Sequence, residues 1–250
     1  THLTKIILLF FLLTIIAPKA FITPCNAVEE GLIGYWNFDE LKEGDSEFFD
    51  FSGNGRNGTL RNNTDFAEGR FGKALKFDGI ADYAEIPFYE ELKCSDAMSL
   101  EAWIYPTPPH QKDVNGGIVN NLHGYPNSRF LITKEGMVMA EIYAGTEHVR
   151  IRGPRAVNGA WNHVVYVYDG TQGIVYVNGE PGESILFSDE VRTATAPLTI
   201  GWGHHLDNYH YNGLMDEVKI FNRALSPHEI AFKAANPPVT LDGRDSKTPA

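Results

Sequence analysis

The sequence lacks a hydrophobic run long enough to span a membrane comfortably. Its first apolar run covers residues 6–16 and is interrupted only by Thr14, whereas a transmembrane helix needs about 20 such residues. Lys5 precedes the run, and small residues lead up to Ala27. This pattern predicts a secretory signal peptide, residues 1–27, cleaved after Ala27. An uncleaved anchor is the alternative, and after cleavage no membrane association is expected.

Cysteine is scarce as well. The chain has only Cys25 and Cys94, so cleavage after Ala27 would leave Cys94 alone and exclude a disulfide within the mature chain. A secreted or periplasmic fold without disulfides depends on its hydrophobic core, and a bound metal can add stability. Hydrophobic residues make up 43% of the sequence, which allows a large core.

Positive charge is in deficit. The chain has 21 Lys and Arg against 32 Asp and Glu, for a formal net charge of −11. Nucleic-acid phosphates would repel such a chain, so no nucleic-acid partner is expected. The same balance suits calcium, which prefers carboxylate and carbonyl oxygens, but an acidic surface can equally serve solubility alone.

Helix signals are rare, and only one is persuasive. Ser226 is an N-cap candidate, Pro227 stands at the first helical position, and Glu229 can complete a capping box. From residue 236 onward the chain becomes polar and rich in proline, which indicates a disordered tail over 236–250. Residues 28–235 are therefore predicted to form one domain.

Short strands account for most of that domain. Residues 99–105 alternate between two faces, and segments 161–168 and 173–177 are rich in Val and Tyr. Asn178-Gly179 is a strong hairpin signal, whereas residues 40–68 are predicted to be a long ordered loop. Regular strands with turn signals predict an all-β fold, a two-sheet antiparallel β-sandwich or jelly roll.

Several motifs occur in a familiar order. They are GLIGYWNFDE at 31–40, GKALKFDG at 72–79, WNHV at 161–164 and GLMDEVKIFNRALS at 213–226. Together they resemble laminin G-like jelly-roll domains of the concanavalin A-like lectin/glucanase superfamily, over about residues 31–232. The resemblance implies two antiparallel sheets with one concave face, in an extracellular binding or structural module that often holds calcium. It does not imply a particular ligand.

Carboxylates at strand ends predict a calcium site. Asp39 ends the first strand and Asp216 lies in the last, and these strands are expected to be antiparallel neighbours. Calcium takes six to eight oxygens, so Asp50, Asn54 and Asp78, in Gly-rich turns, are predicted as further ligands. The alternative is that these side chains form turns by bonding to nearby backbone.

A loop dense in aromatic and polar residues predicts a carbohydrate surface. Sugars stack on aromatic rings, while amides and carboxylates bond their hydroxyls. The predicted contacts are Trp202, His204, His205, Asp207, Tyr209 and Tyr211. Asn121, His123 and Tyr125 form a second such cluster. A ligand-free turn is the alternative for the first loop, and its histidines could instead hold a transition metal.

No catalytic motif is evident in the sequence. The E-x-D-x-E spacing of the glucanase branch is absent, and Asp216 and Glu217, being adjacent on a strand, are expected to face opposite sides. The sequence therefore predicts a non-catalytic, carbohydrate-binding module. The alternatives are an adhesive domain that binds an extracellular protein and a glycoside hydrolase-related enzyme.

Overall fold

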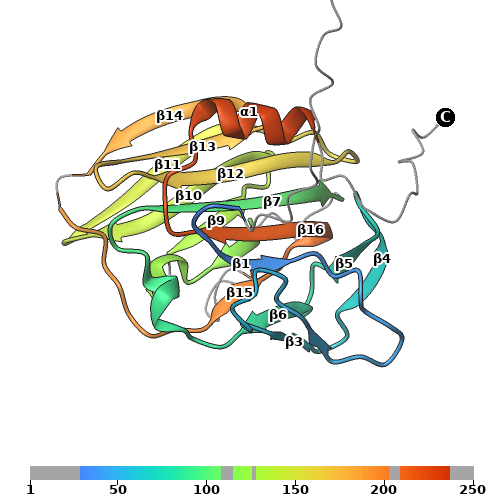
Figure 1. Cartoon of the computed structure of the whole chain (residues 1–250). Helices are drawn as coiled ribbons and strands as arrows, with labels where there is room; N and C mark the ends of the chain where they lie inside the picture. The colour runs from blue at the N-terminus through green and yellow to red at the C-terminus, as the bar shows by residue number, and fades with distance from the viewer. Residues whose placement is uncertain (1–28, 108–114, 126–127, 188, 203–208, 237–250) are drawn as a thin grey trace, which may run out of the picture.

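The computed structural model describes residues 29–107, 115–125, 128–187, 189–202 and 209–236. These residues form two antiparallel sheets that face each other (Figure 1). Sheet I follows the order β14-β13-β12-β7-β16-β5-β4, with β1 also paired to β16. Sheet II follows the order β11-β10-β9-β8-β15-β6-β3-β2. The predicted all-β sandwich is confirmed.

The strands of sheet I come from both ends of the domain. They are β1 (Leu32–Trp36), β4 (Asp65–Glu68), β5 (Lys73–Asp78), β7 (Met98–Pro106), β12 (Asn162–Tyr168), β13 (Gln172–Val177), β14 (Glu180–Leu186) and β16 (Asn212–Phe221). The first and last strands, β1 and β16, are antiparallel neighbours, as the sequence predicts.

Sheet II is built mainly from the middle of the chain. Its strands are β2 (Glu47–Phe48), β3 (Gly58–Arg61), β6 (Tyr83–Ile86), β8 (Gly116–Asn120), β9 (Arg129–Ile132), β10 (Met137–Ala144), β11 (Glu147–Arg155) and β15 (Leu198–Ile200). Two short 3-10 helices, η1 (Glu90–Lys93) and η3 (Leu122–Gly124), connect strands. Strands β2, β3 and β4 lie within residues 40–68, so the expectation of a plain loop there is wrong.

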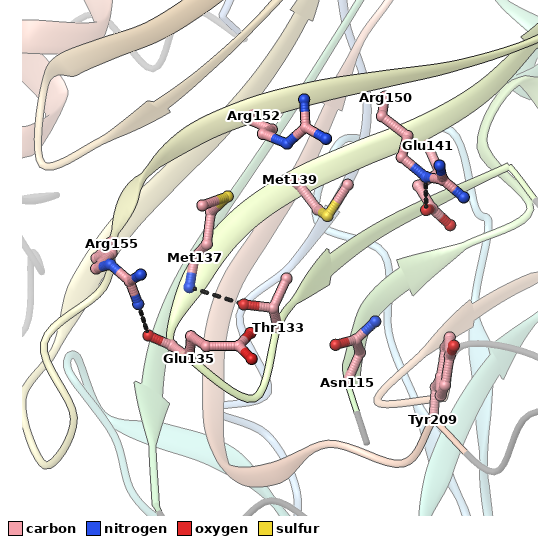
Figure 2. A pocket seen from close by; sticks show the side chains of 10 residues that line it. All are labelled: Asn115, Thr133, Glu135, Met137, Met139, Glu141, Arg150, Arg152, Arg155 and Tyr209. Atoms are coloured by element: carbon pink, nitrogen blue, oxygen red, sulfur yellow. Dashed lines mark hydrogen bonds and ion pairs between the residues drawn. The ribbon is translucent and has the colours of Figure 1, made fainter. Parts of the chain in front are cut away.

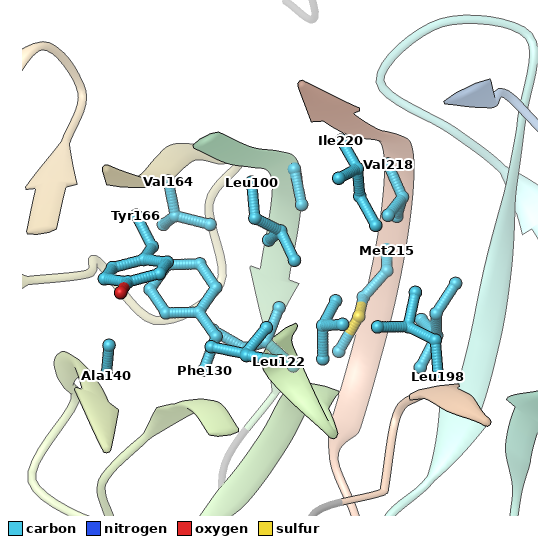
Figure 3. Packing of buried hydrophobic residues seen from close by; sticks show 14 of the residues in the cluster. Leu100, Leu122, Phe130, Ala140, Val164, Tyr166, Leu198, Met215, Val218 and Ile220 are labelled. Atoms are coloured by element: carbon cyan, nitrogen blue, oxygen red, sulfur yellow. The ribbon is translucent and has the colours of Figure 1, made fainter. Parts of the chain in front are cut away.

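The core fills the space between the sheets (Figure 3). Leu100, Ala102 and Ile104 of β7 belong to the core cluster between the sheets, whereas Glu101 and Trp103 do not, which confirms the alternation read from the sequence. Tyr166 from β12 and Phe130 from β9 approach from opposite sheets. Burying one such side chain contributes about 1.5–3 kcal/mol, so this layer supplies the stability of a domain whose described residues form no disulfide.

The two outer faces differ. Helix α1 (Pro227–Ala235) begins with the predicted capping box at Ser226 and Glu229. Its Ile230 packs with Val165 and Phe221 in a second apolar cluster on the outer side of sheet I. Within the described chain, no helix packs in this way on the outer side of sheet II.

Candidate functional site

A pocket of about 460 Å³ opens on the outer face of sheet II (Figure 2). Most of its walls are side chains of β10 and β11, and Asn115 and Tyr209 form the opposite side. Strand geometry explains this arrangement, because alternate residues point to opposite faces of a sheet. Val138 and Ile142 of β10 therefore enter the core, while Met139 faces the pocket.

Basic and non-basic side chains are paired across the pocket floor. In the antiparallel register of β10 and β11, Met137 lies opposite Arg155, Met139 opposite Arg152, Glu141 opposite Arg150 and Tyr143 opposite His148. The sequence interpretation missed this site. Its signal was present in the alternate spacing of Arg150 and Arg152, which places both guanidinium groups on one face.

Glu141 organises the arginines at one end of the pocket. Glu141 is 8% exposed, and its carboxylate lies 2.8 Å from Nε of Arg129 and 2.9 Å from Nε of Arg150. Charge-assisted contacts of this kind are stronger than neutral hydrogen bonds and fix the geometry of both partners. The two arginines are therefore held in place before any ligand binds.

Tyr209 joins the predicted aromatic loop to the pocket. The guanidinium of Arg129 lies 5.0 Å from the centre of the Tyr209 ring, and the Tyr209 carbonyl accepts a hydrogen bond from Gly117 N at 2.9 Å. Trp202 is half-buried and packs on Tyr83, with ring centres 4.9 Å apart. Its ring also stacks on His210 at 5.9 Å. Of the predicted contacts that lie within the described residues, Tyr209 lines the pocket and Trp202 and Tyr211 do not.

The other predicted contacts have different outcomes. Tyr211 is fully buried and packs edge-on against Phe77, with ring centres 6.1 Å apart. The expectation that Tyr211 touches a ligand is wrong, because a ring without exposed surface cannot stack on a sugar. His204, His205 and Asp207 lie outside the described residues.

An aromatic strip continues the same face beyond Glu141. Tyr143 stacks on His148 at 4.7 Å, and Tyr125 lies 5.4 Å from Tyr143. Tyr125 therefore keeps a place on the candidate surface. Its sequence neighbours do not: His123 is fully buried, and the Asn121 amide donates to Pro197 O.

Asp39 and Asp216 hold the same turn, residues 69–73. Asp39 Oδ1 accepts from Lys73 N at 2.8 Å, and Asp216 Oδ2 accepts from Phe71 N at 2.9 Å. Asp216 Oδ1 is buried with no hydrogen-bond partner in the described structure. Burial, and then the negative charges of Glu217 and Asp39, raise the pKa of Asp216 well above its usual range. A cation would relieve this repulsion, so the donor set suits calcium.

The remaining predicted ligands bond to main-chain groups, Asp50 and Asn54 partly to β1 and Asp78 within its own turn. Asp50 accepts from Tyr35 N, Ser52 N and Arg56 N, at 2.8–3.0 Å. The Asn54 amide donates to Ile33 O, and Asp78 accepts from the backbone of the next turn. Within the described ranges, no group of three or more His, Cys, Asp or Glu side chains is arranged to hold a metal. Asp39 and Asp216 are thus the pair that the fold brings to one place.

A bulge in β16 corrects the expectation for Glu217. The register shifts between Asp216 and Lys219, and Glu217 has a φ of 54°. Both carboxylates then lie on the outer side of sheet I, because Asp216 pairs opposite Trp103 and Glu217 accepts from the Tyr35 hydroxyl at 2.9 Å. Period-two alternation fails at such an inserted residue.

The family model described as the concanavalin A-like lectin/glucanases superfamily, of the laminin G type, matches residues 78–231, more than half of the chain. The chain belongs to this superfamily, which confirms the resemblance seen in the motifs. A search of curated proteins gives no match. No helix in the described part is long and apolar enough to cross a membrane.

Solved structures share the fold. Domain 4 of AbnA, an extracellular GH43 arabinanase from Geobacillus stearothermophilus, solved with arabinotriose, is 23% identical with a TM-score of 0.61, covering 81% of this chain and 98% of that one. The binding domain of Paraclostridial Mosquitocidal Protein 1 is 15% identical with a TM-score of 0.67, and the match covers 83% of this chain and 52% of that one. The botulinum neurotoxin serotype D binding domain is also 15% identical, with a TM-score of 0.64, and the match covers 82% of this chain and 51% of that one. The chain thus spans about half of these toxin domains.

Proposed function

We propose that the chain is a non-catalytic, carbohydrate-binding module of an extracellular protein, with its ligand on the outer face of sheet II. The observation that carries the proposal is the pocket itself, where Tyr209 faces the strand pair β10–β11 on a surface that α1 does not cover. The partly exposed ring of Tyr209 beside polar side chains suits a sugar, which offers C–H faces and hydroxyl groups together. The arabinotriose complex of a protein with the same fold is consistent with this use.

The pocket chemistry favours binding over hydrolysis. A retaining glycosidase needs two carboxyl groups about 5 Å apart across the scissile bond, one as acid and one as nucleophile. The pocket offers Glu135 and Glu141, and both oxygens of Glu141 contact arginine. A carboxylate engaged in this way is poorly suited to attack a sugar or to give up a proton.

Replacing Tyr209 tests the position of the ligand. We expect Tyr209→Ala to weaken retention on immobilised polysaccharides about tenfold, because a stacking contact with an aromatic ring contributes on the order of 0.5–1.5 kcal/mol beyond the area that it buries. Affinity electrophoresis against a panel of neutral and acidic polysaccharides measures this loss. Phe232→Ala, at a residue 60% exposed on α1, is the matched control and should bind as the unmodified protein does.

Two results would contradict the proposal. Equal losses in Tyr209→Ala and Phe232→Ala would remove the ligand from this face. A protein that binds no polysaccharide but captures an extracellular protein through the same face would favour the adhesive alternative.

We also propose that a structural calcium is held by Asp39 and Asp216, with main-chain carbonyls and water completing its ligands. The support is the buried, unpartnered Asp216 Oδ1 beside other negative charges. A metal that binds only the folded state adds about 2.7 kcal/mol when present at about 100 times its dissociation constant. Melting in calcium should therefore occur at a higher temperature than melting in chelator.

Variants locate that metal. Asp216→Asn should abolish the difference between calcium and chelator, whereas Asp78→Asn should keep it, because Asp78 serves its own turn. If Asp78→Asn or Asp50→Asn also abolishes the difference, the wider ligand set predicted from the sequence is correct. Identical melting of the unmodified protein in both conditions would remove calcium from the account.

A further inference from the structure

The candidate surface is basic although the chain is acidic. Residues 129–155, which contain β9, β10 and β11, hold five Lys and Arg against three Asp and Glu, an excess of two positive charges in a chain of net charge −11. A strongly acidic molecule repels polyanions in general, so a local basic surface gives a specific place for a negative ligand.

Arg152 and Arg155 are the arginines available to a ligand. Glu141 already engages Arg129 and Arg150. Arg152 lies 3.8 Å from Glu183, in a pair of which both members are about half exposed, and such a surface pair contributes little. Arg155 is exposed and donates to the backbone carbonyl of Glu135. Each guanidinium has five N–H donors, so both retain donors for a carboxylate or sulfate.

Apolar groups lie beside these charges. Met137 is opposite Arg155 and Met139 is opposite Arg152 in the strand register, and Tyr209 stands across the pocket from them (Figure 2). A thioether and an aromatic ring both pack well against the C–H face of a sugar ring. The pocket therefore combines an apolar surface for a sugar ring with guanidinium groups for an acid group.

We propose that this pocket binds an anionic polysaccharide, with sugar rings against the partly exposed Met137 and Tyr209 and with carboxylate or sulfate groups on Arg152 and Arg155. Arginine suits this role because its planar fork matches both acid groups in two-point contacts. This inference rests on the proposed carbohydrate-binding function and names its ligand class.

The extent of the surface favours a chain over a single sugar. From Met137 to Tyr143 the strand advances six residues, about 20 Å at 3.4 Å per residue. The Tyr143–His148 stack and Tyr125 continue the surface, and the Arg192 guanidinium lies 4.9 Å from the Tyr125 ring. A second set of aromatic and basic groups is thus placed along the same line.

Isothermal titration of the purified protein tests the ligand class. The ligands are oligogalacturonate, its fully methyl-esterified neutral form, dextran sulfate and uncharged dextran. We expect binding to an acidic ligand and at least about tenfold weaker binding to its neutral counterpart, since a hydrogen bond to a charged group contributes about 1.5–3 kcal/mol. The acidic ligand that binds identifies the acid group as carboxylate or sulfate.

Charge variants test the residues. Arg152→Gln/Arg155→Gln should weaken acidic-ligand binding about tenfold or more by the same reasoning. Arg61→Gln/Lys76→Gln removes the same charge from exposed sites outside the pocket and should change binding less than about twofold, because salt screens distant charges. Unchanged melting temperatures confirm that both variants are folded.

The outcomes separate the two proposals. Equal binding of acidic and neutral ligands, or equal losses in the two double variants, overturns the anionic ligand and leaves the carbohydrate module in place. Failure of all four ligands also overturns this inference. The polysaccharide panel with Tyr209→Ala then decides whether the carbohydrate-binding function survives.

Discussion

At the residue scale, His123 was expected in a polar surface cluster but is buried in the fold. The sequence places His123 in a polar cluster, but the structure buries it completely. Its Nδ1 lies 3.0 Å from Cys94 O, and its Nε2 lies 3.3 Å from the Tyr166 hydroxyl. Burial lowers the pKa of His123 from its usual 6.5 to about 4, so the ring is neutral in the folded protein near pH 7.

This burial predicts a pH-dependent stability. Protonated His123 is more stable in the unfolded chain than in the folded chain. The free energy of unfolding therefore has its full value above pH 6.5 and decreases as the pH falls toward 4. The full loss amounts to about 3 kcal/mol, at about 1.4 kcal/mol per pKa unit. The neighbouring Cys94 and Tyr166 stay neutral in this range, because burial raises both of their pKa values.

Urea unfolding between pH 4 and 7 measures the effect. His123→Gln should flatten the decline in unfolding free energy, since an amide does not take up the proton. His228→Gln, at an exposed position on α1, should leave the decline unchanged. Parallel profiles for the unmodified protein and His123→Gln would show that another group is responsible.

At the element scale, short sequence motifs correctly predicted the turn and the helix cap that they form. Asn178 and Gly179 have φ values of 53° and 85°, as their hairpin signal implies, and Ser226 and Glu229 form their capping box. The strands within residues 40–68 escaped prediction because they have two to four residues each and depend on neighbouring strands. The bulge at Glu217 escaped because glutamate has no preference for positive φ that would reveal it.

The pocket depends on register, which the sequence specifies only indirectly. Residues of β10 and β11 alternate in character, but their pairing as Met139 with Arg152 and Glu141 with Arg150 needs the hairpin alignment. Tyr209 reaches the same pocket from a segment more than 50 residues away. Sequence reasoning therefore found the aromatic loop and missed the basic floor opposite it.

The helix supplies a prediction that separates stability from binding. Ser226 Oγ accepts from Glu229 N at 3.2 Å, and loss of such a cap costs about 1 kcal/mol. Ser226→Ala should lower the unfolding free energy by this amount and leave polysaccharide binding unchanged, because α1 packs on sheet I. His228→Ala, which removes no cap, serves as the reference. A loss of affinity in Ser226→Ala would place ligand contacts near the helix.

At the scale of the whole molecule, the two outer faces have different uses. The outer side of sheet I packs against α1 and, beside β1, contains the buried carboxylates of Asp216 and Glu217. The outer side of sheet II presents the pocket and the aromatic strip. Residues 129–155, which contain β9, β10 and β11 of sheet II, have a local positive excess in an acidic chain. The outer face of sheet I thus stabilises the fold, and the outer face of sheet II is the proposed ligand surface.

Hydrogen–deuterium exchange with and without a saturating polysaccharide tests this division most directly. We expect slower exchange on ligand binding in β10 and β11 and at Tyr209, with no change in β1, β16 or α1. Protection confined to sheet I, or to the turn at residues 69–73, would contradict the assignment of the ligand to the outer face of sheet II.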